Sequence, residues 1–295
     1  MTLAATGDLV DAARAAGHGV GAFNVICLEH AEAVAAGAAE AGAAVILQVS
    51  HNAVRFHGAA GPLVAACREV AASAAVPVAV HLDHLEDPAL AGQAPALRVS
   101  SLMFDAATRP YAENVALTRA VAEQAHAAGL WVEAELGEVG GKDGAHGLGA
   151  RTDPAQAGDY VAATGVDGLA VAVGSSHAMV TRSARLDLGL IARLAAAVPV
   201  PLVLHGSSGV PLPTLAAAVA AGITKVNVGT ALNTAYTAAV RAALAADGKV
   251  VDPRRYLAGA RTAMAAAVAE VVAALAGAPA GMPGHPPAGS AARPR

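Results

Sequence analysis

Short apolar runs alternate with Ala-rich stretches along most of this chain. Eight runs rich in Val, Ile, Leu and Ala have the length of buried β-strands. They cover residues 20–25, 44–50, 76–84, 101–106, 131–137, 168–174, 201–207 and 223–230. The stretches between them, including 28–42, 110–129 and 188–198, combine strong helix propensity with apolar positions at helical spacing. The pattern therefore predicts strands and helices in alternation.

Eight strand–helix repeats favour one architecture. Helical crossovers join parallel strands with a right-handed sense, and eight such units close into a TIM (β/α)8 barrel. A barrel of about 250 residues fits within the chain of 295, so we expect a single α/β domain over residues 1–276. Residues 277–295, with His285, are rich in Pro, Gly and Ala without periodicity, which predicts a disordered tail. Pro88 and Pro95 predict a poor helix after the third strand.

Polar side chains are concentrated at the carboxyl ends of the predicted strands. The interior positions of these strands are otherwise almost purely Val, Ile, Leu and Ala. The polar residues at the strand ends are Asn24, Gln48, Ser50, Asp83, His84, Asp105, Glu133, Glu135, Asn227 and the segments 175–177 and 205–208. Because TIM barrels carry their active sites at this face, we expect the chemistry to lie there.

Three histidines end strand-like runs: His84 in VPVAVHLDH, His177 in LAVAVGSSH and His205 in PLVLHG. They are separated by 93 and 28 positions, so no local zinc-finger spacing joins them and only a tertiary fold could. Neutral imidazole is the usual zinc ligand, and three protein ligands with one open position are typical of a catalytic site. The sequence therefore predicts a metal enzyme.

Charge and cysteine content narrow the class of protein. With 19 basic and 23 acidic residues the net charge is −4, which offers no footprint for nucleic acid or an anionic membrane. Neither a signal peptide nor about twenty continuous apolar residues is evident. Cys27 and Cys67 show no metal or redox spacing and fit a reducing cytosol, as core or helix residues. We expect a soluble, cytoplasmic protein without nucleic-acid or membrane partners.

Small residues follow the last three predicted strands. The motifs are GSSH at 174–177, HGSSG at 205–209 and NVGT at 227–230. TIM barrels commonly bind phosphate after strands seven and eight, through backbone N–H groups and a helix N-terminus. Ser208 and Thr230 would add hydroxyl donors. Taken alone, NVGT fits an ordinary helix N-cap at Thr230 equally well.

Together these motifs resemble the class II, zinc-dependent fructose-1,6-bisphosphate and tagatose-1,6-bisphosphate aldolases. The resemblance runs from AFN (22–24) through HLDH, FDA, VEAELGEVGG, GSSH, LVLHGSSG and KVNVGT to DPRRY (252–256). It implies a lyase of carbohydrate metabolism that reversibly cleaves the phosphorylated ketose to dihydroxyacetone phosphate and glyceraldehyde 3-phosphate, as a dimer or tetramer of identical chains.

The resemblance also implies roles for individual residues. The ligands of the catalytic zinc would be His84, His177 and His205, and the acid/base at the C4 hydroxyl would be Asp83. Asp105 and Glu135 are similar to carboxylates that hold an alternative or second metal position, for a divalent or a monovalent cation. The implied substrate contacts are Gly174, Gly206, Ser208, Gly229 and Thr230 for the dihydroxyacetone phosphate moiety, Asn227 for its enediolate, Asn24 and Ser50 elsewhere, and Arg254, from a neighbouring subunit, for the far phosphate.

A Gly-rich loop departs from the family's pattern. Where many members carry acidic residues after the glycine pair, this chain has GGKDG at 140–144. The base that strips a proton from dihydroxyacetone phosphate would then be Asp143, or another acid such as Glu138. The glycines of 137–153 suit a mobile lid, although a disordered linker has the same composition.

Other interpretations stay open at this point. A Schiff-base aldolase needs a lysine on a strand, and of Lys142, Lys225 and Lys249 only Lys225 qualifies, with an inward orientation permitted. The three histidines would then have no role. A non-catalytic barrel that binds sugar phosphates is a second alternative. The substrate could also be another phosphorylated ketose, because epimers at C4 differ by the orientation of one hydroxyl.

Overall fold

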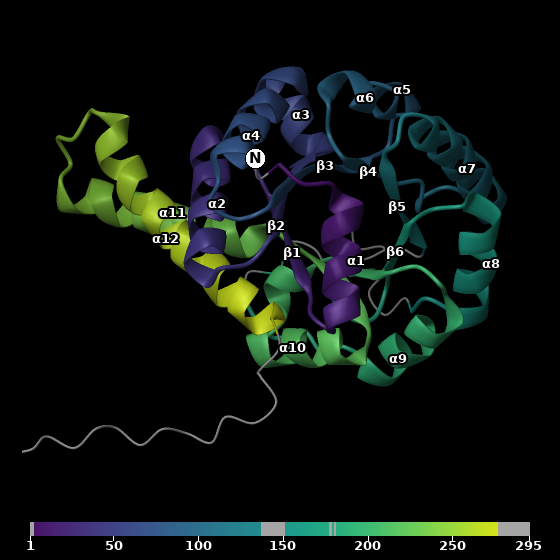
Figure 1. Ribbon diagram of the computed structural model, residues 1–295. Helices are drawn as coiled ribbons and strands as arrows, with labels where there is room; N and C mark the ends of the chain where they lie inside the picture. Colours follow the sequence, from purple (N-terminus) through teal and green to yellow (C-terminus); the bar gives the residue numbers. More distant parts are fainter. Residues whose placement is uncertain (1–2, 137–150, 177–178, 180, 277–295) are drawn as a thin grey trace, which may run out of the picture.

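Eight parallel strands form a closed barrel in sequence order (Figure 1). The computed structural model describes residues 3–136, 151–176, 179 and 181–276. The strands are β1 (Val20–Asn24), β2 (Val45–Ser50), β3 (Val78–Leu85), β4 (Ser101–Phe104), β5 (Trp131–Leu136), β6 (Gly168–Val171), β7 (Leu202–Leu204) and β8 (Ile223–Val228). The single-domain TIM barrel is confirmed, and each strand lies inside its predicted run or within one residue of it. The predicted tail at 277–295 lies outside the described residues.

Helices surround the barrel on its outer face (Figure 1). They are α2 (Leu28–Ala41), α3 (His51–His57), α4 (Gly61–Ser73), α7 (Tyr111–Ala127), α8 (Pro154–Thr164), α9 (Leu188–Ala197), α10 (Leu212–Ala221), α11 (Thr230–Ala246) and α12 (Pro253–Leu275). The crossover between β3 and β4 has only the single-turn helices α5 (Pro88–Ala91) and α6 (Ala94–Leu97), each with a proline in its first turn. The weak helix predicted there is confirmed, because proline starts a helix readily but interrupts its interior.

The amino-terminal end of the barrel is closed by α1 (Thr6–Ala16). Val10 of this helix packs against Ala22, Ile46 and Ala79, which point into the barrel from three strands. Because this end is filled with apolar side chains, the open end is the one where the strands have their carboxyl termini.

The middle of the barrel is more polar than the sequence suggests. His81 is fully buried and its Nδ1 lies 2.7 Å from Ser101 Oγ. Burial lowers the pKa of His81 to about 3, so its imidazole is neutral. Glu133 and Lys225 are also fully buried. Polar and charged side chains therefore occupy this layer of the barrel interior.

A helical hairpin of α11 and α12 extends beyond the barrel (Figure 1). Helix α12 is long and apolar enough to cross a membrane by length and composition, the one such helix among the described residues. Core helices of soluble proteins meet the same criterion. The carboxyl-terminal half of α12 packs on the barrel, with Met264, Val268 and Val271 buried in the main core.

Candidate metal and substrate site

A pocket of about 400 Å³ opens at the carboxyl ends of the strands. It is lined by the predicted site residues Asn24, Ser50, Asp83, His84, Gly206, Ser208, Asn227, Gly229 and Thr230, and by Ile26, Gln48, Asn52, Ala53, Phe56, Ser207 and Asn233. Nine predicted residues from five segments of the chain therefore meet in one pocket.

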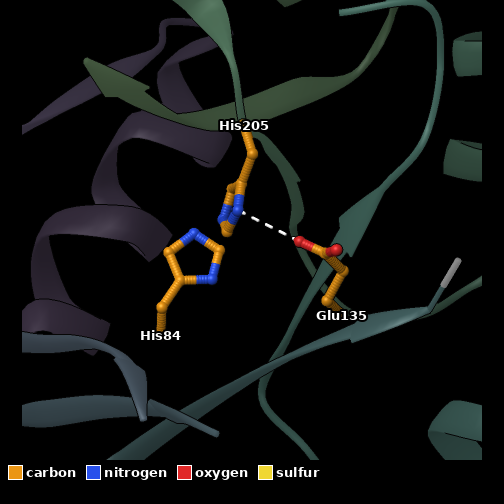
Figure 2. Close-up of side chains that lie close together, drawn as sticks. All are labelled: His84, Glu135 and His205. Atoms are coloured by element: carbon orange, nitrogen blue, oxygen red, sulfur yellow. Dashed lines mark ion pairs between the residues drawn. The ribbon is translucent and has the colours of Figure 1, made fainter. Parts of the chain in front are cut away.

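Three side chains converge beside this pocket in a way that suits a metal ion (Figure 2). His84, Glu135 and His205 are buried, and one ligand atom of each lies within 4.8 Å of the others. The two imidazole rings meet edge to face, with centroids 4.6 Å apart. Imidazole and carboxylate are ligands for zinc and other divalent metals, so the donor set fits the expected group.

The backbone of β3 bends so that His84 can reach this cluster. Successive side chains of a strand point to opposite faces, which would turn His84 away from the side that Asp83 faces. A register shift between Leu82 and Leu85 interrupts the pairing with β4, and His84 has a φ of 52°. Left-handed backbone costs a non-glycine residue about 1–2 kcal/mol. The strain brings two adjacent functional side chains to the same site.

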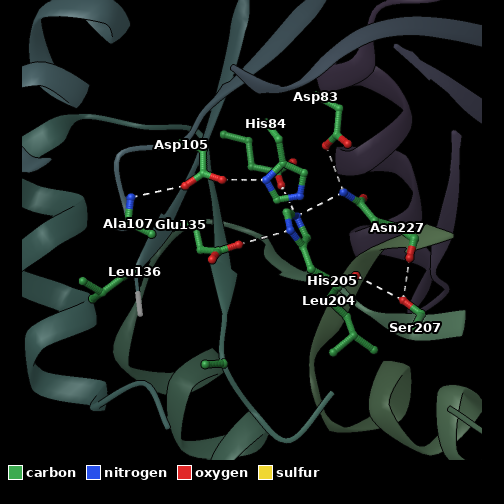
Figure 3. Close-up of polar contacts among 12 residues, drawn as sticks. Asp83, His84, Asp105, Ala107, Glu135, Leu136, Leu204, His205, Ser207 and Asn227 are labelled. Atoms are coloured by element: carbon green, nitrogen blue, oxygen red, sulfur yellow. Dashed lines mark hydrogen bonds and ion pairs between the residues drawn. The ribbon is translucent and has the colours of Figure 1, made fainter. Parts of the chain in front are cut away.

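Carboxylates orient both imidazole rings (Figure 3). His84 Nδ1 lies 2.7 Å from Asp105 Oδ2. His205 lies between two acids, with Nε2 2.8 Å from Glu133 Oε1 and Nδ1 3.2 Å from Glu135 Oε2. Burial alone would lower the pKa of His205, but its bonds to Glu133 and Glu135 raise it to about 9. A metal ion at Nδ1 would replace a proton there, as metal ions commonly do when they bind imidazole.

Asp83 is buried beside the cluster and faces the pocket. Its Oδ1 accepts a 3.4 Å hydrogen bond from Asn227 Nδ2 (Figure 3). Burial alone would raise the pKa of this carboxyl, but the positive charges of His84 and His205 hold it below its ordinary value. Asp83 is therefore ionised at neutral pH and can accept a proton.

A cradle of small residues forms one wall of the pocket. Gly206 has a φ of 67° and begins a 3-10 turn over Ser207–Gly209. Ser208 Oγ accepts a 3.0 Å hydrogen bond from the Ala231 backbone N–H, in the first turn of α11. The positive end of the α11 dipole thus points at the pocket, which favours an anionic ligand.

Replacing Gly206 with alanine should destabilise this cradle. A Cβ there would lie 2.6 Å from the carbonyl of Ser176, and the left-handed φ would be strained as well. We expect Gly206→Ala to lower the free energy of unfolding by about 1–3 kcal/mol in denaturant titrations. Gly248→Ala is the matched control, because a Cβ at Gly248 meets nothing within 4 Å. Equal stability of the two variants would contradict the steric argument.

The matching family model is that of class II fructose-bisphosphate aldolase, and it covers residues 4–278. The chain belongs to the class II fructose-bisphosphate aldolase family. It is 37% identical over 272 residues to a fructose-bisphosphate aldolase of Geobacillus stearothermophilus, covering 91% of this chain and 95% of that protein. Class II aldolases are metal-dependent lyases, and the cluster at His84, Glu135 and His205 is a possible metal site in this chain.

Solved structures agree with this assignment. The YdjI aldolase of Escherichia coli K12 superposes with a TM-score of 0.79 at 29% identity, covering 92% of this chain and 97% of that one. A fructose-bisphosphate aldolase of Campylobacter jejuni superposes with a TM-score of 0.76 at 23% identity, covering 91% and 93% of the two chains. The second likeness shows the shared fold.

Two pocket residues have structural partners of their own in this aldolase. Asn24 Oδ1 accepts a short hydrogen bond from Gln48 Nε2, which leaves the Asn24 amide nitrogen available to a ligand. Ser50 Oγ accepts a 3.2 Å hydrogen bond from Ala53 N and so caps α3. In the sequence, Gln48 is recognisable only as a polar strand end. Its support of Asn24 depends on the pairing of β1 with β2.

Several predicted positions do not lie in the pocket. Gly174 has a φ of 118°, and its space is closed by the Arg185 carbonyl, 2.3 Å from where a Cβ would be, so its backbone serves a turn. Gly229 and Thr230 do line the pocket, as the N-cap and the first residue of α11, so the alternative N-cap at Thr230 was wrong by one residue. Asp105 contacts His84 and is not part of the three-residue cluster.

The predicted lid is only partly within the described residues. His177, Glu138 and Asp143 lie outside them, so their roles stay predictions. Thr152, at the end of the same segment, is buried and joins two strands: its Oγ1 donates to the Leu136 carbonyl at 2.9 Å and accepts from Ala172 N at 2.8 Å. Asp153 caps α8. Thr152 and Asp153, at the end of the Gly-rich loop, are therefore anchored to the barrel, and the lid itself stays a prediction.

Arg254 lies at the start of α12 and does not line the pocket. Its Nε and Nη2 donate to the two carboxylate oxygens of Asp252 at 3.0 and 2.7 Å, and its side chain is 90% exposed. Within one chain, Arg254 is therefore a surface arginine paired with Asp252. A role toward substrate requires a second subunit and stays a prediction.

Proposed function

We propose that this chain is a zinc-dependent aldolase that reversibly cleaves fructose 1,6-bisphosphate, or its C4 epimer tagatose 1,6-bisphosphate, to dihydroxyacetone phosphate and glyceraldehyde 3-phosphate. The observation that carries the proposal is the convergence of His84, Glu135 and His205 beside a pocket that also holds an ionised Asp83 and a phosphate-type cradle. The corresponding enzyme class is fructose-bisphosphate aldolase, acting in glycolysis.

We assign the metal ligands to side chains of this chain. His84 and His205 would be two ligands, and His177 the third. Glu135 and Asp105 would offer an alternative or second position, for a divalent or a monovalent cation. Bound zinc would act as a Lewis acid toward the substrate's ketone and neighbouring hydroxyl, which lowers the energy of the enediolate.

Proton transfer is assigned to Asp83. In cleavage its carboxylate takes the proton of the C4 hydroxyl, the C3–C4 bond breaks, and the C4 oxygen becomes the aldehyde of glyceraldehyde 3-phosphate. The electron pair remains on the dihydroxyacetone phosphate fragment as an enediolate, toward which Asn227 can donate its amide N–H. Asp143 then returns a proton to C3, and in condensation it removes that proton.

The cradle at Gly206, Ser208, Gly229 and Thr230 would hold the C1 phosphate, and Asn24 and Ser50 would contact the remainder of the substrate. Gly174 would contribute to phosphate binding through its backbone. A C6 phosphate needs another cation, which we assign to Arg254 of a neighbouring subunit in a dimer or tetramer.

Loss of Arg254 should affect one substrate class selectively. A charge-assisted contact contributes about 1.5–3 kcal/mol, so Arg254→Ala should raise KM for a 1,6-bisphosphate about ten- to hundredfold. Cleavage of a ketose 1-phosphate should be nearly unchanged. Arg109→Ala, which removes another exposed, ion-paired arginine, is the control. Equal losses on both substrates, or none on either, would show that Arg254 does not recognise the C6 phosphate.

A second candidate substrate class is the ketose 1-phosphates. Neither Lys nor Arg lines the pocket within the part of the chain that the structure describes. Recognition of a second phosphate therefore depends on a residue supplied from elsewhere. Without that contribution, the aldehyde half of the substrate would meet Asn52, Phe56 and Asn233, which suit an uncharged polyol.

The deciding experiment is a coupled cleavage assay across phosphorylated ketoses, with and without chelator. Metal-dependent release of dihydroxyacetone phosphate from fructose or tagatose 1,6-bisphosphate supports the proposal, and the preferred epimer identifies the substrate. Absence of turnover on every bisphosphate, with turnover on a ketose 1-phosphate, would transfer the proposal to that class.

The cysteines support action in the cytoplasm. Cys27 and Cys67 form no disulfide, as expected in a reducing compartment.

A further inference from the structure

Lys225 is a fully buried charge beneath the metal cluster. It points from β8 into the barrel, as the sequence permitted, and it is not among the residues that line the pocket. Its Nζ donates to Glu133 Oε2 at 2.8 Å and to Asn227 Oδ1 at 2.6 Å. Each of these two partners in turn contacts a residue of the proposed reaction centre.

The first partner is the amide of Asn227. An ammonium group can only donate, so only the amide oxygen of Asn227 can face Lys225, and the amide nitrogen must face the opposite way. That nitrogen donates to Asp83 Oδ1 at 3.4 Å and lies 3.0 Å from His205 Nε2, whose own proton is directed at Glu133 Oε1. A charge-assisted bond at the oxygen also makes the amide N–H a stronger donor. Lys225 thus determines that Asn227 presents a donor to the site.

The second partner is the carboxylate of Glu133. Glu133 is fully buried and accepts from Lys225 Nζ, whose charge compensates that of the carboxylate, so Glu133 remains an acceptor. Its other oxygen lies 2.8 Å from His205 Nε2. A proton held at Nε2 leaves Nδ1, the nitrogen that faces Glu135, to bind metal. Lys225 therefore also supports the metal-binding tautomer of His205.

Lys225 is badly placed for covalent chemistry. A Schiff-base lysine must reach a substrate carbonyl with a neutral amine. Lys225 is 0% exposed and its amine is ion-paired with Glu133. Freeing it would leave the Glu133 charge buried without compensation, which is strongly unfavourable.

The geometry points to Lys225 as a positioning residue of the aldol reaction: through Asn227 it orients the donor for the enediolate, and through Glu133 it fixes the metal-binding nitrogen of His205. This inference rests on the proposed function for its first branch. The second branch concerns metal binding alone and can be tested on a protein that shows no turnover.

The first branch is tested by a double-mutant cycle at saturating zinc. Removing one preorganised donor costs about 10²–10³-fold in kcat, so Asn227→Ala should lose about that much and Lys225→Met a large part of it, with KM little changed. In the Asn227→Ala background, Lys225→Met should cost almost nothing more. Independent, additive losses would overturn this branch. Lys249→Met, on an exposed residue, should leave kcat and KM unchanged.

The second branch is tested by zinc affinity, measured by competition with a chromophoric chelator. Supporting residues of metal ligands are worth about 10–100-fold in metal affinity, and Lys225→Met should show a loss of that order that persists in the Asn227→Ala background. Unchanged affinity would overturn the branch. If Lys225→Met does not fold, Lys225→Met with Glu133→Gln removes both buried charges and should show the same two losses. Trapping of substrate on Lys225 by borohydride would overturn the whole inference.

Discussion

Chelation of the metal should lower cleavage of fructose 1,6-bisphosphate about 10³-fold or more, and added Zn²⁺ should restore it. The reason is the charge that develops when the C3–C4 bond breaks. The described pocket offers amide and hydroxyl donors to the enediolate, such as Asn227 and Ser208, but no lysine or arginine. Lewis-acid stabilisation is worth several kcal/mol, and each 1.4 kcal/mol corresponds to a tenfold change in rate.

Variants test whether this metal dependence arises at the cluster of His84, Glu135 and His205. His205→Ala should bind zinc weakly and should not recover when zinc is added, because it removes a ligand that two carboxylates hold in place. His126→Ala is the matched control: His126 is a histidine paired with Asp167 at the surface, and its loss should leave metal content and rate unchanged. Activity that survives complete metal removal, or substrate trapped by borohydride on a lysine, would contradict the metal-dependent mechanism.

The strand pattern predicted the barrel because a short, continuous run of apolar residues is typical of a strand buried on both faces of a parallel sheet. Parallel strands covered on both faces need continuous apolar side chains, and the Ala-rich segments between them had no other favourable structure. Boundaries differed by a few residues where strands end in glycine or histidine. The GLAVAVG run, for example, ends its ladder at Val171, because residues beyond it form the turn at Gly174.

Much of the pocket was also predictable, because strand ends in a closed barrel meet at one face whatever their separation in sequence. Asn24, Asp83 and Asn227 come from strands far apart in the chain and line one pocket. The placement of His84 was less predictable. Alternation along β3 sends it away from Asp83, and only the register shift and the left-handed backbone return it to the same site.

The buried ion pair that supports the site, Glu133 with Lys225, could not be predicted from the sequence. Glu133 and Lys225 are 92 positions apart, and nothing in either local motif indicates that they form an ion pair. Alternation indicated only that Lys225 could point inward. Which side chains meet inside a barrel depends on the stagger of the strands and on side-chain length, and the periodicity of the sequence gives neither. The same limit applies to Gln48 and Asn24, whose hydrogen bond follows from the register of β1 against β2.

Replacing Asp83 with asparagine should lower kcat by about 10²–10⁴-fold with little change in KM, because positioned acid/base groups contribute about that factor. Asparagine has nearly the same shape as Asp83 and leaves His84 and His205 in place, so metal content should stay at the wild-type level. The carboxylate is ionised because nearby positive charges outweigh its burial, and the amide cannot accept the C4 proton at any pH. Asp87→Asn, at the exposed cap of α5, is the control and should retain full activity. An unchanged kcat in Asp83→Asn, with normal metal content, would assign proton transfer at C4 to another group.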